Sequence, residues 1–206
     1  MNPIKEVCVE SSQEAVLAAR AGATRIELCG DLSCGGTTPS YETIKRTIEK
    51  LQIPVMVMIR PRGGDFCYTN DEFEIMRKDI RICRELGAAG VVLGLLNGDN
   101  TIDIERTSEL VNLARPLMVT FHKAIDSAKD IPLSVEQLKT IGVDWILSSG
   151  GEKTAIEGCE MLLKMIEIAG DQLNIIVAGK VTWENFDEIA RLIPAKEYHG
   201  RKLVNF

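Results

Sequence analysis

The sequence predicts an α/β protein, a TIM (β/α)8 barrel whose final helix is missing or truncated. Eight short β-rich runs recur along the 206 residues at intervals of about 20–35 residues, as βα units require. Most runs are separated by stretches whose apolar residues recur every three or four positions, which is typical of amphipathic helices. A doubly wound open sheet often carries a G-x-G-x-x-G pattern after its first strand, and no such pattern follows the first run here. A barrel near the lower size limit of about 200 residues is therefore the better prediction.

The eight expected strands are rich in β-branched and apolar residues. They cover residues 4–10, 24–29, 54–59, 89–94, 117–122, 144–149, 174–179 and 196–200. Between them, Ser11 with Glu14 and Thr69 with Glu72 have the spacing of a capping box. Glycines after three helices indicate a left-handed turn into the next strand.

No chain remains after the eighth strand for a last helix, so we expect an exposed flank or one covered by another subunit. Monomers seldom expose such apolar surface, and this predicts a homo-oligomer, a dimer. Nothing in the composition marks a domain boundary, so residues 1–206 are expected to form one domain.

Charge and hydropathy exclude several classes of partner. The net charge of -6 argues against a nucleic-acid binder, which would need a basic face. No stretch approaches the roughly 20 apolar residues of a membrane span, and the first residues lack the pattern of a signal peptide. We therefore expect a cytoplasmic protein without a membrane partner.

Alternation along the strands predicts which side chains face the inside of the barrel. In the first two strands the apolar residues form one set and the polar residues the other. The polar sets must face the interior, where a charge is costly unless it is paired or binds a ligand. The residues expected inside are Glu6, Cys8, Glu10, Arg25, Glu27, Cys29, Met56, Met58, Arg60, Thr120, His122, Glu197 and His199.

Several of these residues end their strands, at the barrel face where such folds keep their active sites. Glu27, Arg60, His122 and Asp126 are the candidates for an enzyme acting on a small anionic substrate, with Arg60 binding the anion. The alternative is that Glu27 and Arg60 form a structural ion pair. The run "SSGG" at 148–151, ahead of a helix expected near Glu152, has backbone N–H groups that could bind an anion.

Two cysteines share an inward position on neighbouring strands. Cys8 and Cys29 would have Cα atoms about 5 Å apart if the strand register were level. Two thiols at that distance suit Cu(I), and Met56 or Met58 could add a thioether. The alternative is that both are inert core residues. Since the chain has no C-x-x-C pair, zinc-ribbon and thioredoxin-like sites are not expected.

The motifs resemble those of the CutC family, named for copper homeostasis. The matching runs are "EVCVES", "GATRIELC", "GGTTPSY", "VMIRPRGGDF", "TFHKAID", "ILSSGG" and "EYHGRK". The resemblance covers about residues 4–202 and implies a cytoplasmic TIM barrel that binds Cu(I) through Cys8 and Cys29. It implies no settled reaction. Three positions depart from the family pattern, Lys123, Ser148 and Lys180, where arginine, threonine and glycine are usual.

Overall fold

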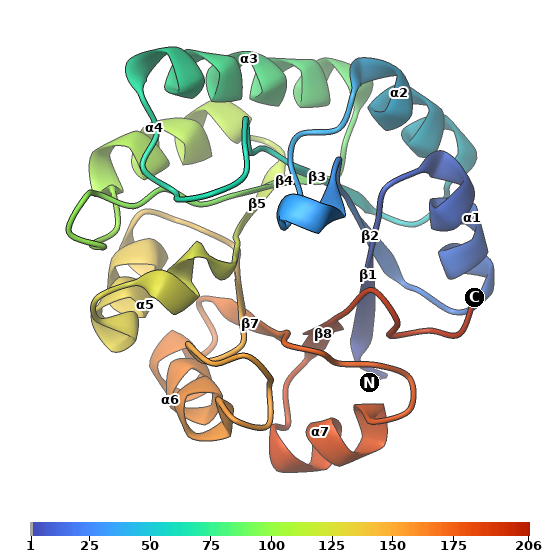
Figure 1. The fold of residues 1–206 in the computed structure, drawn as a ribbon, viewed down its shortest axis with the longest axis vertical. Coiled ribbons are helices and arrows are strands. Elements are labelled where there is room, and N and C mark those ends of the chain that lie inside the picture. Colours follow the sequence, from blue (N-terminus) through green and yellow to red (C-terminus); the bar gives the residue numbers. More distant parts are fainter. Residues whose placement is uncertain (1) are drawn as a thin grey trace.

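The computed structural model describes residues 2–206 and contains a closed barrel of eight parallel strands (Figure 1). Each strand pairs with its two neighbours in sequence order, and β1 pairs with β8. The predicted TIM barrel is therefore confirmed. The strands are β1 (Ile4–Val9), β2 (Arg25–Leu28), β3 (Val55–Met58), β4 (Gly90–Leu93), β5 (Met118–Phe121), β6 (Trp145–Ser148), β7 (Asn174–Val177) and β8 (Glu197–His199).

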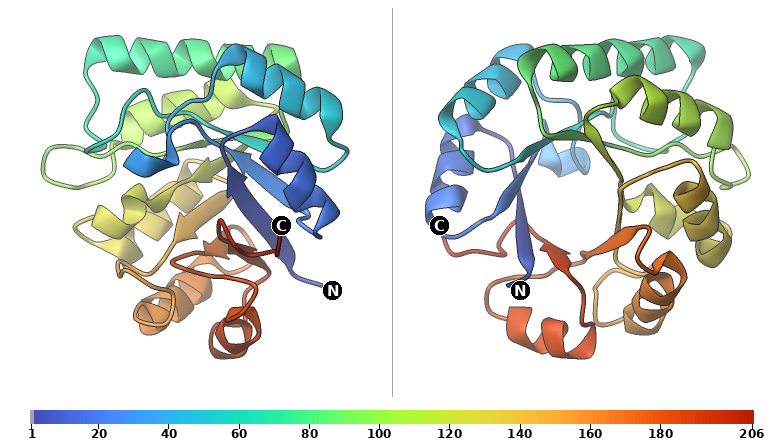
Figure 2. Two further views of the ribbon diagram at one scale, coloured as in Figure 1. Left: turned by 45° about the vertical axis from the view of Figure 1, so that its right-hand side comes forward. Right: turned by 180° about the vertical axis from the view of Figure 1, so that it is seen from behind.

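Within residues 2–206 the chain forms seven α-helices. The two further views show the helices around the outside of the barrel (Figure 2). They are α1 (Ser12–Arg20), α2 (Tyr41–Lys50), α3 (Asn70–Leu86), α4 (Ile104–Ala114), α5 (Ile131–Thr140), α6 (Cys159–Ala169) and α7 (Phe186–Leu192), with 3-10 helices η1 (Leu32–Cys34) and η2 (Lys123–Ser127). None of the helices within residues 2–206 is long and apolar enough to cross a membrane.

Residues 200–206 form no eighth helix, as expected. They fold back instead, because Leu203 and Val204 are buried and Lys202 forms a β-bridge with Thr182. Part of the flank between α7 and α1 is thus covered by the chain's own last residues, where the C-terminus lies beside α1 (Figure 1).

The helix signals of the sequence are largely confirmed. Thr69 and Glu72 form a complete capping box at the start of α3. Ser11 accepts a hydrogen bond from the Glu14 N–H, but the Glu14 carboxylate accepts from the N–H of Glu10, so the second half of the expected box is shifted by one residue. The glycine that ends α3, Gly87, has a left-handed φ of 74°.

Alternation places two different layers on the two sides of the strands. Val7, Val9, Ile26 and Leu28 pack outward against the helices. Inside, β3, β4, β6 and β7 contribute an apolar lining, whereas β1, β2 and β8 contribute buried charged side chains. The charged inward residues are Glu6, Arg25, Glu27, Glu197 and His199. The interior is therefore divided into an apolar part and an ionic part.

Candidate metal and ligand site

A cavity of about 290 Å³ opens at the C-terminal ends of the strands. Glu27, Arg60 and His122, three of the four candidates for an enzyme, all line it. Leu32, Met58, Phe66 and Leu147 supply its apolar walls; Cys8, Cys34, Gly35, Lys123 and His199 complete the lining. Phe66, in the loop after β3, is a lining residue that alternation along the strands could not identify.

Three of the lining residues could hold one metal ion. Ligand atoms of Cys8, Glu27 and His199 all lie within 4.8 Å of one another, and the three residues are buried. The strand register explains their meeting, because Cys8 pairs with Glu27 across β1 and β2 while Glu6 pairs with His199 across β1 and β8. The sequence placed all three inside the barrel but did not group His199 with Cys8.

The expectation of a level register between Cys8 and Cys29 is wrong. Because Glu27 is the partner of Cys8, Cys29 lies two residues further along β2, about 6.6 Å toward the mouth. Strands of a closed barrel are staggered, and alternation does not reveal the stagger. Cys29 still faces inward, where it packs against Met56 and Met58. Its Sγ donates a hydrogen bond to Glu27 Oε2 at 3.4 Å, so both thiols are neighbours of one carboxylate.

An ionic network forms the floor beneath these donors. The Arg25 guanidinium binds Glu6 through Nε and Glu197 through Nη2, at 2.5 Å for the latter. Trp145 donates its indole N–H to Glu197 at 2.7 Å and stacks on Arg25. Every member has a charged or hydrogen-bonded partner, as buried charges require.

His199 joins this network to the metal donors. Its Nδ1 lies 2.9 Å from Glu6 Oε1, and its Nε2 lies 3.8 Å from Glu27 Oε2. Burial disfavours the charged ring, yet the negative charge of Glu27 and hydrogen bonding to Cys8 and Glu6 raise the pKa of His199 well above its usual value. The pKa of the Cys29 thiol is also raised well above its usual value, by burial first and then by Glu27.

Arg60 is held by backbone carbonyls and not by a carboxylate. Its terminal nitrogens donate to the carbonyls of Cys34, Gly36 and Gly64 at 2.9 to 3.0 Å. Within residues 2–206 it makes no ion pair with Glu27, so the expected structural pair is absent. Both N–H groups of Nη1 are thus engaged, whereas Nη2 has one of its two N–H groups engaged. The Nε–H group is buried and has no partner among the described residues.

His122 is a neutral donor in the same cavity. Its Nδ1 accepts a hydrogen bond from the N–H of Ala124 at 3.2 Å, so the proton of the neutral ring is on Nε2. That Nε2 atom is buried without a partner. Burial and the nearby charge of Arg60 lower the pKa of His122 to about 3.

Asp126 is not among the residues that line the cavity. Its carboxylate binds instead to the N–H groups of the "SSGG" turn. The N–H groups of Ser149 and Gly151 donate to the Asp126 carboxylate, the latter at 2.9 Å. The Ser148 hydroxyl and the Lys123 ammonium, each at 2.5 Å, complete the shell. The turn binds an anion as the sequence suggested, but the anion is the chain's own side chain. The helix expected near Glu152 begins only at Cys159.

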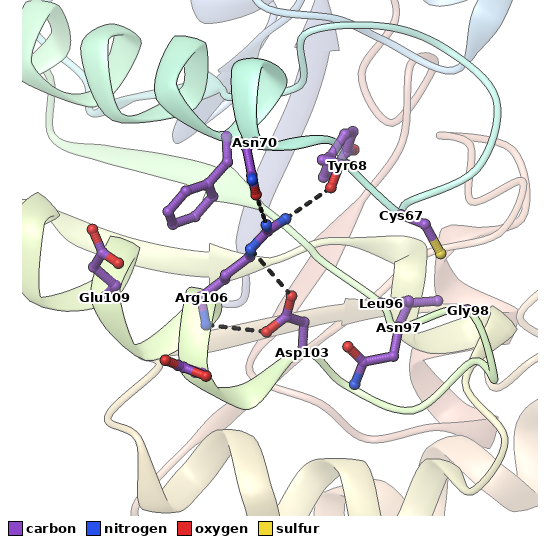
Figure 3. A pocket seen from close by; sticks show the side chains of 11 residues that line it. Cys67, Tyr68, Asn70, Leu96, Asn97, Gly98, Asp103, Arg106 and Glu109 are labelled. Atoms are coloured by element: carbon purple, nitrogen blue, oxygen red, sulfur yellow. Dashed lines mark hydrogen bonds and ion pairs between the residues drawn. The ribbon is translucent and has the colours of Figure 1, made fainter.

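A larger hollow lies elsewhere on the molecule. It measures about 650 Å³ and is bordered by the N-terminal ends of α3 and α4 (Figure 3). Arg106 crosses it, but its guanidinium already donates to Tyr68 O and Asn70 Oδ1 and lies 3.8 Å from Asp103. With its central cation satisfied, this hollow offers less ligand chemistry than the barrel mouth.

Comparisons with known proteins agree with this architecture. The model of the CutC family matches residues 3–204. This chain belongs to the CutC family. A human copper homeostasis protein cutC homolog is 44% identical over 196 residues, 95% of this chain and 72% of that protein. A Dictyostelium discoideum protein of the same description is 38% identical, covering 94% of this chain and 80% of its own length.

The fold of this CutC chain is shared with solved structures. A CutC protein from Streptococcus agalactiae superposes with a TM-score of 0.93 at 36% identity, covering 98% of this chain and all of that one. At 12% identity, an aldolase with a TM-score of 0.69 shares the fold alone. Of the departures from the family pattern, Lys180 adopts a left-handed φ of 56°, the conformation that glycine adopts most readily.

Proposed function

We propose that the protein binds copper as Cu(I) in the mouth of the barrel, with Cys8 and His199 as ligands and Cys29 as the second thiolate. The observation that carries this proposal is the buried group of Cys8, Glu27 and His199, whose ligand atoms lie within 4.8 Å. Membership of a family whose curated relatives are named for copper homeostasis supports it.

The chemistry of the donors fits the ion. Cu(I) prefers few, soft ligands, which thiolate and imidazole provide and carboxylate does not. We therefore assign Glu27 another role: its Oε2 already accepts the hydrogen bond of the Cys29 thiol and is placed to take that proton when the thiolate forms. Burial raises the pKa of Glu27, and this favours a carboxylate that takes up a proton.

Proton release makes this binding pH-dependent. His199 must lose a proton before either ring nitrogen can bind metal, and each thiol must lose one as well. Apparent Cu(I) affinity should therefore weaken as the pH falls below neutrality. The Glu6 carboxylate binds Nδ1 of His199 and so keeps the ring oriented with its Nε2 toward Glu27.

A competition titration of the reduced protein with bicinchoninate tests the proposal. We expect one Cu(I) per chain, loss of that site in Cys8→Ser, and weaker binding in Cys29→Ser and His199→Gln. Cys83→Ser is the matched control, since Cys83 is fully buried but belongs to the outer core on α3. Unchanged affinity in Cys8→Ser would exclude this site.

We further propose that the protein works in the cytoplasm as a homodimer of one-domain subunits, without a nucleic-acid or membrane partner. The net charge of -6 supports the absence of nucleic acid. Trp183 and Phe206, each about half exposed, line a groove of about 380 Å³ near the C-terminus. Light scattering at micromolar concentration should give twice the subunit mass, and a monomeric mass would contradict the dimer.

A second candidate function is an enzyme acting on a small anionic substrate at the same face. The observation in its favour is the pair of unpartnered nitrogens of Arg60 and His122. Groups of this kind, when left unpaired in a cavity, are expected at ligand sites. Turnover of a small organic acid, lost in His122→Phe, is the result that would establish it.

A further inference from the structure

Among the described residues that line the cavity, two buried N–H groups have no hydrogen-bond partner. They are Arg60 Nε and His122 Nε2, on side chains of residues only 5% and 4% exposed. Leaving such donors unpaired in the interior is costly, and most buried donors in folded proteins are paired. The cavity that both residues line is the space from which a partner would come.

The two donor groups belong to the same wall. The Arg60 guanidinium lies 5.0 Å from the centroid of the Phe66 ring, and the His122 ring centroid lies at the same distance from it. Arg60 is also close enough for its charge to lower the pKa of His122. Arg60 and His122 are therefore both neighbours of one aromatic ring of the cavity lining.

The positive charge of Arg60 indicates that the ligand carries a negative charge. Within the described residues, backbone carbonyls bind its terminal nitrogens and no carboxylate forms an ion pair with it. The other cation at this wall, Lys123, is already paired with Asp126 at 2.5 Å. Since His122 is neutral, the pair presents one uncompensated positive charge and two fixed donors, which is the pattern that binds a carboxylate.

The carboxylate of Glu27 does not fill this position. Glu27 pairs in register with Met56, and Arg60 lies four residues beyond Met56 toward the mouth. Glu27 instead lies beside His199 Nε2 and Cys29 Sγ, in the deeper group of metal donors. The metal donors and the unpartnered donors thus occupy different levels of one cavity.

The apolar residues of the lining indicate the chemistry of the part of the ligand that lies beyond its charged group. Leu32, Met58, Phe66 and Leu147 are apolar, and the cavity of about 290 Å³ has room for a small ring or a short chain. A polar or multiply charged body would lose its hydration there without new partners. The site therefore favours a monocarboxylate with a compact apolar part.

We propose that this wall binds a small organic monocarboxylate, with Arg60 Nε–H and His122 Nε2–H donating to its oxygens and its apolar part lying against Met58 and Phe66. This deepens the second candidate function by naming the substrate class, and it is independent of copper. Binding requires no metal, because neither nitrogen belongs to the group of metal donors.

The test measures benzoate binding calorimetrically to protein freed of metal by a chelating resin, with benzyl alcohol as the uncharged isostere. We expect one benzoate per chain and at least about ten-fold weaker binding of the alcohol, since hydrogen bonds to charged groups are the stronger ones. His122→Phe should weaken benzoate about ten-fold, whereas His122→Gln, which retains an N–H donor, should recover most of the affinity.

Arg60→Gln and Arg62→Gln form a matched pair in the same loop. Arg62 is ion-paired with Asp65 and Glu72 and does not line the cavity. We expect Arg60→Gln to abolish benzoate binding and Arg62→Gln to retain it, with circular dichroism confirming that both fold. Equal binding of benzoate and benzyl alcohol, no benzoate binding at millimolar concentration, or insensitivity to His122→Phe would overturn the proposal. Copper titration of the same variants separates this failure from failure of the metal site.

Discussion

The two histidines of the chain occupy equivalent places and have opposite properties. His199 ends β8 and His122 follows β5, and both rings are buried at the mouth of the barrel. Burial by itself acts to lower the pKa of both rings, because it disfavours the charged form. His199 faces the carboxylates of Glu6 and Glu27 and its pKa rises, whereas His122 faces Arg60 and its pKa falls to about 3.

The contrast shows that charged neighbours from other strands and loops, more than depth, decide what each histidine can do. The side of the mouth formed by β8, β1 and β2 gathers acids and a thiol, which suits a cation. The side formed by the loops after β3 and β5 gathers an unpaired arginine and a neutral N–H donor, which suits an anion. One barrel mouth therefore combines two sites of opposite preference.

The acidic side depends most on Arg25, whose removal should give the largest effect. Arg25→Met leaves Glu6 and Glu197 buried without their cation, and loss of one partner of a buried pair costs about 3–5 kcal/mol. Urea unfolding measures this loss. Arg46→Met is the matched control, since Arg46 forms only an exposed pair with Glu42, and the change expected is less than about 1 kcal/mol. A loss below about 1 kcal/mol in Arg25→Met would contradict the importance of the network.

The basic side includes the turn filled by Asp126, and its loss should have a smaller effect. Asp126→Asn weakens the bonds from Ser149, Gly151 and Lys123, for which we expect a loss of about 1–3 kcal/mol in unfolding free energy. Asp171→Asn, at an exposed carboxylate with only a 3.9 Å contact to Lys196, is the control. Equal stability of the two variants would show that the turn does not need the carboxylate.

The pH dependence of stability should separate the two histidines by sign. The folded pKa of His122 lies below its unfolded value, so stability falls as the pH drops from about 6.5 toward 3, by at most about 1.4 kcal/mol per pH unit. His199 has the opposite sign: its contribution is complete below about 6.5 and is lost as the pH rises through its raised folded pKa.

Urea unfolding of His122→Gln between pH 7 and pH 4.5 measures the first of these contributions. The variant should lose less stability than the parent over this range. An identical slope in both proteins would mean that His122 takes up its proton in the folded state near its ordinary pKa.

The sequence predicts the barrel and its inward residues because both follow from local patterns. Alternation along the strands predicts that Cys8, Glu27 and His199 face the inside, and the recurrence of eight strands predicts a closed sheet. The grouping of these residues depends on the stagger between strands, which pairs Cys8 with Glu27 and leaves Cys29 nearer the mouth. No local pattern carries that information.

The loops were harder to predict for a similar reason. The "SSGG" turn has the N–H groups of an anion site, but its occupant, Asp126, comes from a loop 25 residues earlier than Gly151. Likewise, Arg60 could be identified as an inward cation, but the carbonyls of Cys34, Gly36 and Gly64 that hold it belong to irregular backbone.

The comparison of the two histidines also offers the most direct test of the metal site. The chain has only two histidines, so nitrogen-15 labelling of histidine gives two ring spectra, which His122→Gln assigns. On addition of one equivalent of Cu(I) to the reduced protein at neutral pH, the His199 ring should lose a proton and shift, while the His122 ring should remain neutral and unchanged. An unmoved His199 ring, with copper bound, would contradict the account.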